Sequence, residues 1–267
     1  MTHTDIGPDV LQRGGLRVES AGTVTTITLD RPSTKNSQTP ATWLALRAIG
    51  ARLPTGTRAV VLQGEGDSFS SGLDRRMLTP EGMDGEASLL QLLAMPDAEL
   101  SATIATYQEG FTWLRRPDIV SIAAVQGHAI GAGFQLALSC DLRVLSEDAT
   151  LSMRETQLGL VPDLTGTKPL VELVGYSRAL EICATARSVG ANEAREIGLA
   201  TAVVPREELR QTVADLVAAL TAPMPGAVSE TKALLHSAGV LDLDQQRRVE
   251  REAQVRRFRE LASMMGE

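Results

Sequence analysis

Short strand-like segments alternate with helical segments along most of this sequence, and this alternation limits the folds open to it. Residues 59–62 and 119–125 are almost entirely apolar, which is typical of strands that are buried on both faces. Further strands are expected in residues 16–29, as a hairpin around Gly22, and in residues 142–145, 150–153 and 200–204. Strands that alternate with helices indicate an α/β protein with a parallel or mixed sheet.

Helical patterns fill the intervals between the strands and then replace them. Helices are expected in residues 40–53, 101–116, 134–140, 165–174, 177–187 and 191–197, whereas residues 78–100 are irregular and predict a mobile loop with helical pieces. After Pro205 only three helical patterns follow, in residues 206–220, 227–238 and 243–265. We therefore expect a mixed core in residues 1–205 and a separate α-helical region in residues 206–267.

The overall charge argues against some classes of partner. The chain has a formal net charge of -7 at pH 7 and a pI of about 5.2, whereas nucleic acid and anionic membranes attract concentrated positive charge. No stretch approaches the roughly 18 consecutive apolar residues of a membrane helix, and the N-terminus lacks a secretory signal pattern. His3, His128 and His236 are scattered, with no other ligand at metal-binding spacing. We expect a cytoplasmic protein that binds no nucleic acid, membrane or metal ion.

A glycine-rich segment, residues 127–133, follows a strong strand pattern and precedes a short helix. Such a turn exposes backbone N–H groups at a helix N-terminus, where they attract negative charge. One interpretation is a tight packing turn. Another is a dinucleotide site, although Leu136 stands where its third glycine would be and the helix is short. The third is an oxyanion hole, for which residues 69–74 offer a second N–H donor after their own buried strand.

Five segments, taken together in order and spacing, are more specific than any one alone. They are residues 29–32 with Asn36, residues 69–74, residues 127–141, Glu155 with residues 158–162, and Ala194 with residues 198–199. From about residue 18 to residue 204 the chain resembles the enoyl-CoA hydratase/isomerase (crotonase) superfamily.

The resemblance implies a crotonase-like spiral of ββα units with a C-terminal α-helical trimerisation unit. Residues 1–205 would be the acyl-CoA-binding catalytic core, and residues 206–267 the oligomerisation region of a homotrimer or a dimer of trimers. Coenzyme A would be present only as part of the acyl-CoA substrate, with no permanently bound cofactor. The N–H groups of Leu73 and Ala132 would hold the thioester oxygen, and the family usually has glycine at the latter position. Glu155 matches the family's acid/base residue, whose pKa an apolar pocket would raise.

By the same resemblance, a second group of residues would contact the coenzyme A part of the substrate. Ser33, Thr34 and Lys35 would contact its nucleotide or its pantetheine arm. Ser71 and Asp74 would help to shape the loop around the adenine. Lys35 could equally be an ordinary solvated lysine.

Two departures from the family pattern bear on the reaction. Gln135 stands where hydratases carry a second glutamate, and an amide can hold water but cannot exchange protons near neutral pH. Asp163 stands where dienoyl-CoA isomerases have a functional aspartate, although it could instead cap the helix expected from Thr165. One glutamate suffices to move a double bond, so we expect isomerisation with Glu155 as the proton shuttle. The alternatives are a hydratase that uses Glu155 with Gln135 and Asp163, and a non-catalytic acyl-CoA-binding protein.

Overall fold

Two sheets form the centre of the protein. The computed structural model describes residues 6–79, 81–83, 85–86 and 88–266. In these residues a six-stranded sheet has the order β1-β2-β3-β4-β6-β9, and only β1 and β2 pair antiparallel. Its strands are β1 Leu16–Ala21, β2 Val24–Leu29, β3 Ala59–Gly64, β4 Val120–Val125, β6 Leu142–Ser146 and β9 Ala202–Val204. The smaller sheet joins β5 His128–Ile130, β7 Thr150–Ser152 and β8 Val189–Gly190.

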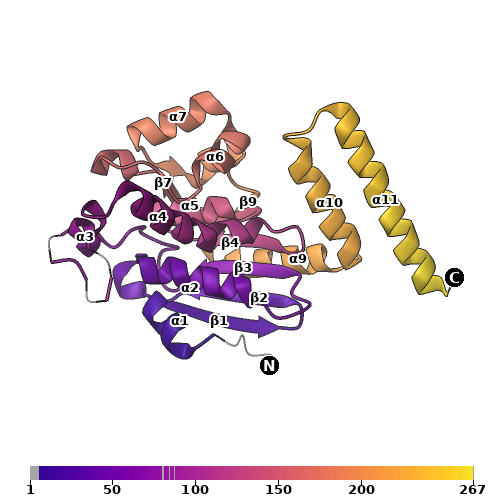
Figure 1. Ribbon diagram of the computed structural model, residues 1–267, viewed down its shortest axis with the longest axis horizontal. Helices are drawn as coiled ribbons and strands as arrows, with labels where there is room; N and C mark the ends of the chain where they lie inside the picture. Colours follow the sequence, from indigo (N-terminus) through magenta and orange to yellow (C-terminus); the bar gives the residue numbers. More distant parts are fainter. Residues whose placement is uncertain (1–5, 80, 84, 87, 267) are drawn as a thin grey trace.

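Helices surround the sheets and extend beyond them at the C-terminal end (Figure 1). They are α1 Pro8–Gly14, α2 Pro40–Ala51, α3 Leu89–Leu93, α4 Asp97–Thr112, α5 Ala132–Ser139, α6 Thr167–Val174, α7 Tyr176–Thr185, α8 Ala191–Glu196, α9 Leu209–Thr221, α10 Pro225–Ala238 and α11 Leu243–Met265. The predicted alternation of strands and helices, and the end of the strands near residue 205, are confirmed. The sequence did not predict α1, β5 or β8.

The six-stranded sheet is covered on both faces, as its apolar strands predict. One face contributes to the main core, which also contains side chains of α2, α4 and α5. The main-core residues on β3, β4 and β6 are Val60, Leu62, Ala123, Val125 and Leu145. The opposite face packs against α9; it presents Ala59, Val61, Ile122, Ala124 and Val144 to Leu209, Val213 and Val217. Helix α9 therefore covers this face of the sheet.

Helices α10 and α11 extend from the body and lie side by side (Figure 1). The division of the chain at residue 205 into a catalytic core and an oligomerisation region stays a prediction. In the described part of the chain, no single helix is long and apolar enough to cross a membrane. Residues Arg206–Thr221 and Pro225–Ala238 reach that length and hydropathy only as a pair, and they are bent by 101° relative to each other.

A buried lysine fastens α10 to the body. The Lys232 ammonium donates hydrogen bonds of 2.7 Å to the carbonyl oxygens of Arg116 and Ile119 and to the Asp141 carboxylate. Asp141 also accepts a 2.8 Å hydrogen bond from the Ser121 N–H at the start of β4. Burial lowers the pKa of Lys232, and the neighbouring Asp141 charge opposes that effect. All three ammonium protons are thus used between α10 and the main sheet.

We predict that Lys232→Met lowers the free energy of unfolding by about 3 kcal/mol, because it leaves the half-buried Asp141 carboxylate without its cation. Urea unfolding at neutral pH measures the change. Lys168→Met is the control, since Lys168 forms an exposed pair with Glu172 and should contribute under about 1 kcal/mol. Equal losses in the two variants would contradict a structural role for the Lys232 contacts.

Candidate active site

The site begins where two loops cross. The Ser70 N–H donates to the His128 oxygen at 2.7 Å, and the Ile130 N–H donates to the Ser70 oxygen at 3.0 Å. Gly72 has φ 82°, and a Cβ there would lie 2.3 Å from the Ile130 oxygen and 3.4 Å from the Ala132 nitrogen. Only glycine allows this approach without strain. The 69–74 loop and the glycine-rich 127–133 segment therefore meet backbone against backbone.

The two N–H groups singled out from the sequence lie at this crossing. Ala132 is the first residue of α5, so its N–H has no partner within the helix. Gln38 pairs with the other loop on either side of Leu73: its N–H donates to the Gly72 oxygen and its oxygen accepts from the Asp74 N–H, both at 2.8 Å. Among the described backbone hydrogen bonds, none uses the N–H of Leu73 or of Ala132. Both groups are available to a bound oxygen.

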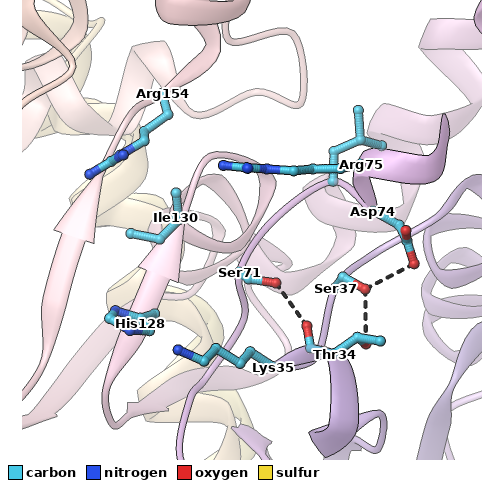
Figure 2. A pocket seen from close by; sticks show the side chains of 10 residues that line it. Thr34, Lys35, Ser37, Ser71, Asp74, Arg75, His128, Ile130 and Arg154 are labelled. Carbon is cyan, nitrogen blue, oxygen red and sulfur yellow. Dashed lines mark hydrogen bonds between the residues drawn. The ribbon is translucent and has the colours of Figure 1, made fainter. Parts of the chain in front are cut away.

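A cavity of about 350 Å³ opens beside these donors, and we call it the apolar cavity. Its lining combines apolar side chains with the crossing itself and seven polar residues: Trp43, Leu78, Ile104, Ile130, Leu158, Leu160, Val161 and Leu164, then Leu73 and Ala132, then Gln135, Glu155, Gln157, Asp163, Ser71, Arg75 and Arg154. A second, polar cavity of about 420 Å³ adjoins the first and shares five lining residues with it: Ser71, Leu73, Arg75, Ile130 and Arg154 (Figure 2). Leu73 thus lies where an apolar and a polar chamber join.

Glu155 is the buried carboxylate of the apolar cavity, with 9% of its surface exposed. It begins a short 3-10 turn, and its Oε1 atom accepts a 2.6 Å hydrogen bond from the Gln135 amide. Its Oε2 atom is buried without a partner among the described residues. A Cβ at Gly131 would lie 3.4 Å from Oε1, so the carboxylate lies beside the start of α5. Desolvation raises the pKa of Glu155, the Gln135 hydrogen bond opposes this, and the Asp163 charge adds to it.

Gln135 is completely enclosed and has a fixed orientation. Its side-chain oxygen accepts hydrogen bonds from the N–H groups of Leu164, at 2.9 Å, and Gly166, at 3.2 Å. Its amide nitrogen must therefore face Glu155, since the oxygen is already turned toward those two donors. In the hydratase alternative this side chain orients a water molecule, whereas in the structure it donates to the glutamate.

Asp163 lines the same cavity as Glu155. The residue is exposed at the opening, yet the surrounding protein desolvates its carboxylate and raises its pKa. The alternative in which Asp163 caps a helix is wrong, because α6 begins later, at Thr167, with Gly166 at its N-cap. Asp163 and Glu155 are therefore two carboxyl groups with raised pKa values facing one cavity.

The residues predicted to contact coenzyme A lie around the polar cavity, with one exception. Its lining includes Thr34, Lys35, Ser71 and Asp74 but does not include Ser33. The Ser71 hydroxyl donates to the Thr34 oxygen at 3.0 Å, and the Ser71 N–H donates to the Lys35 oxygen at 2.8 Å (Figure 2). These contacts join the 69–74 loop to the turn after β2.

Asp74 holds this junction together. Its carboxylate accepts hydrogen bonds from the side chain of Arg76 at 2.8 Å and 3.0 Å, from Arg31 at 2.9 Å and from Ser37 at 3.1 Å. These contacts, led by that from Arg76, hold the pKa of Asp74 well below its usual range. The oxygens of Asp74 are therefore already occupied by contacts within the protein, and its role around the adenine stays a prediction.

Five lining residues of the polar cavity were not predicted as site residues, among them two arginines and a histidine. Arg75, His128 and Arg154 surround it together with Lys35 (Figure 2). Arg75 and Arg154 are adjacent in sequence to Asp74 and Glu155, which was the signal that could have identified them. Guanidinium and ammonium groups suit phosphate oxygens. Within the described residues, no group of three or more His, Cys, Asp or Glu side chains could hold a metal ion.

Comparison with known proteins decides the family. Residues 19–266 match the sequence model described as enoyl-CoA hydratase/isomerase. The chain belongs to the enoyl-CoA hydratase/isomerase family. The resemblance to the crotonase superfamily is thus confirmed.

Family members with different names are similar to this chain. The short-chain-enoyl-CoA hydratase of Clostridium acetobutylicum is 30% identical over 234 residues, covering 85% of this chain and 83% of that protein. The human mitochondrial Delta(3,5)-Delta(2,4)-dienoyl-CoA isomerase is 33% identical over 232 residues, covering 83% of this chain and 69% of that protein. As a member of this family, the chain is an enzyme of the hydratase or isomerase type.

Solved structures of family members share the fold. A Thermobifida fusca YX protein assigned as an enoyl-CoA hydratase was solved in complex with acetoacetyl-CoA; it is 54% identical, the match covers 94% of this chain and 98% of that one, and the TM-score is 0.91. The structure with CoA gives 52% identity, coverage of 98% and 100%, and a TM-score of 0.92. The predicted crotonase-like fold is confirmed, whereas the trimerisation role of its C-terminal helices stays a prediction.

Burial of Glu155 has a consequence for stability that can be measured. Folding raises the pKa of this carboxyl above its ordinary value of 4.5, so the folded state holds the proton more tightly than the unfolded chain. The linked stability is present below pH 4.5 and is lost as the pH rises through the folded pKa.

We predict that Glu155→Gln removes this loss, because an amide does not ionise. The variant should gain thermal stability at about pH 8, by about 1.4 kcal/mol for each unit of the raised pKa, and the gain should shrink as the pH falls. Thermal unfolding across pH measures it. The exposed control Glu147→Gln should show no such gain. If Glu155→Gln and wild type have the same thermal stability at every pH, the Glu155 carboxylate is exposed to solvent and the prediction is wrong.

Proposed function

We propose that this enzyme moves a double bond within an enoyl-CoA thioester, with Glu155 as the proton shuttle. The observation that carries the proposal is the arrangement around Glu155: one buried carboxylate faces the apolar cavity, and the Gln135 amide that replaces a second glutamate is fully engaged in holding it. The adjoining polar cavity, with its arginine and lysine side chains, suits the phosphates of coenzyme A.

The proposed reaction uses these groups in turn. The ionised Glu155 removes a proton from C2 of a 3-enoyl or 3,5-dienoyl thioester, and the negative charge spreads onto the thioester oxygen. The N–H groups of Leu73 and Ala132 stabilise that oxygen, and one such donor is typically worth about 3 kcal/mol. Glu155 then returns the proton to the far end of the conjugated system. No water is consumed, and the carboxylate is regenerated.

The same contacts disfavour hydration. Adding water requires a second group that exchanges protons with it. The Gln135 oxygen already accepts two N–H groups, so it is not available to accept from a water molecule. A hydratase route would leave Asp163 as the second proton-transfer group. We propose instead that Asp163 assists Glu155 in proton return, since it lines the same cavity and its charge raises the pKa of Glu155.

We predict that Glu155→Gln lowers kcat for 3-enoyl-CoA or 3,5-dienoyl-CoA isomerisation by about a thousandfold or more, because the proton carrier is lost. Acyl-CoA binding should persist, since the two N–H donors and the polar cavity are unchanged. Absorbance of the conjugated thioester follows turnover, and calorimetry follows binding. The exposed Glu147→Gln should retain full activity.

The same assay separates the alternatives. If wild-type enzyme removes the conjugated thioester absorbance of crotonyl-CoA, the protein is a hydratase. Binding without either reaction would make it a non-catalytic acyl-CoA-binding protein. Undiminished isomerisation by Glu155→Gln would remove Glu155 from the mechanism.

We also propose that α10 and α11 assemble the protein into a homotrimer or a dimer of trimers. The pair is tied together by the Arg256 guanidinium, which contacts the Glu230 carboxylate at 2.6 Å and 2.8 Å. Large apolar side chains on and between these helices stay exposed in the single chain: Leu235, Val240, Leu243, Val255, Phe258, Met264 and Met265. Exposed apolar area of this kind favours association.

We predict that Phe258→Lys, which places a charge where 62% of a phenylalanine is exposed, shifts the protein toward monomer. Sedimentation velocity measures the assembly. Gln12→Lys is the control, since it adds the same charge at an exposed polar position of α1, outside the proposed interface helices, and should leave assembly unchanged. Identical sedimentation of the Phe258→Lys variant and wild type would exclude this residue from the interface.

A further inference from the structure

Trp43 forms an aromatic wall of the apolar cavity. It lies on α2 with 8% of its surface exposed. Its ring packs against Tyr107 of α4, with centroids 5.1 Å apart, and near Phe111, at 6.5 Å. Ile104, one turn before Tyr107 on α4, lines the same cavity. Because α2 and α4 support this wall from behind, the Trp43 ring has little freedom to move aside.

A buried chain of hydrogen bonds runs from the indole to the crossing of the two loops. The Trp43 indole N–H donates to the Gln38 side-chain oxygen at 2.9 Å, and the Gln38 amide donates to the Ser70 hydroxyl at 3.0 Å. The Ser70 hydroxyl donates to the Asn36 oxygen at 2.8 Å and accepts from the Gly72 N–H at 3.2 Å. Gln38 and Ser70 are fully buried, so neither has water as a substitute partner.

We propose that Trp43 determines which acyl chains the enzyme accepts and, through Gln38 and Ser70, positions the N–H of Leu73. The ring limits the length of an apolar, linear acyl chain, while the indole N–H fixes the loop one residue before Leu73. This inference rests on the proposed acyl-CoA site. It makes Trp43 a specificity and positioning residue rather than a group that reacts.

Two substitutions separate the two roles. Trp43→Leu removes the wall and enlarges the cavity, so dissociation constants for saturated acyl-CoAs should shift in favour of longer chains, by about tenfold in the ratio of long to short. Trp43→Phe keeps most of the wall and removes the donor. It should keep the wild-type length preference and lower kcat for isomerisation about tenfold with little change in KM.

The other tryptophan supplies a matched control. The chain has two tryptophans, and Trp113 is equally buried, at 8% exposed, but lines a separate surface groove. Its indole N–H has no partner among the described residues. Trp113→Leu should leave chain-length preference unchanged. Trp113→Phe leaves Trp43 as the only indole, whose emission should respond to acyl-CoA more strongly than to free coenzyme A.

Binding of saturated acyl-CoAs, measured by calorimetry, decides the inference independently of turnover. If the wild-type protein binds saturated acyl-CoAs with a length preference but isomerises no substrate, the proposed function is wrong. The specificity role of Trp43 is then still decided by the binding measurements on Trp43→Leu. Unchanged length preference in Trp43→Leu would overturn the specificity role, and unchanged kcat in Trp43→Phe would overturn the positioning role. Should Trp43→Leu unfold, Ile104→Ala enlarges the same cavity without touching the indole and should favour longer chains.

Discussion

The site depends on the direct contact between two backbone segments at Gly72 and Ile130. A glycine with positive φ lets the carbonyl of Ile130 approach where any side chain would collide. That contact brings the N–H of Leu73 next to the N–H at the start of α5, although the two come from distant parts of the sequence. The six-stranded sheet supports both segments, because β3 leads into one loop and β4 into the other. The two proposed oxyanion donors are thus main-chain groups, placed by the contact at Gly72 and, in our proposal, also by the side chains of Gln38 and Ser70.

Burial of Glu155 raises the pKa of its carboxyl group and also destabilises the folded protein when that group is ionised. The apolar surroundings that raise the pKa of Glu155 penalise its charged form, and the Gln135 amide compensates only one of its two oxygens. Such an unfavourable burial of charge is typical of functional sites, which lower the stability of the folded protein. The Trp43 ring lines the same cavity as Glu155, and hydrogen bonds through Gln38 and Ser70 connect it to the 69–74 loop. In our proposal, substrate shape and charge stabilisation are therefore set by residues in mutual contact.

Sequence motifs singled out Leu73, Ala132 and Glu155, which line one cavity in the structure, because the order and spacing of these motifs are strongly constrained by the fold. Other features depend on tertiary contacts that no local pattern records. Strand β5 has three residues between glycines and shows no periodicity, and the amphipathic pattern of α9 does not say which surface it covers. Gln135 is turned by N–H groups 29 and 31 residues further along the chain, so its orientation could not be predicted. The sequence suggests Asp163 as a helix cap because its pattern predicts a start of α6 at Thr165, two residues before the observed start at Thr167.

The central claim is that two main-chain N–H groups hold a thioester oxygen while Glu155 reaches the adjoining carbon. Exchange of the C2 protons of a saturated acyl-CoA with solvent deuterium tests it most directly, because this needs the enolate but no double bond. Mass spectrometry or NMR would follow the label. The wild-type enzyme should incorporate deuterium at C2, and Glu155→Gln should not. Absence of exchange at high wild-type concentration, or equal exchange by the variant, would contradict the claim.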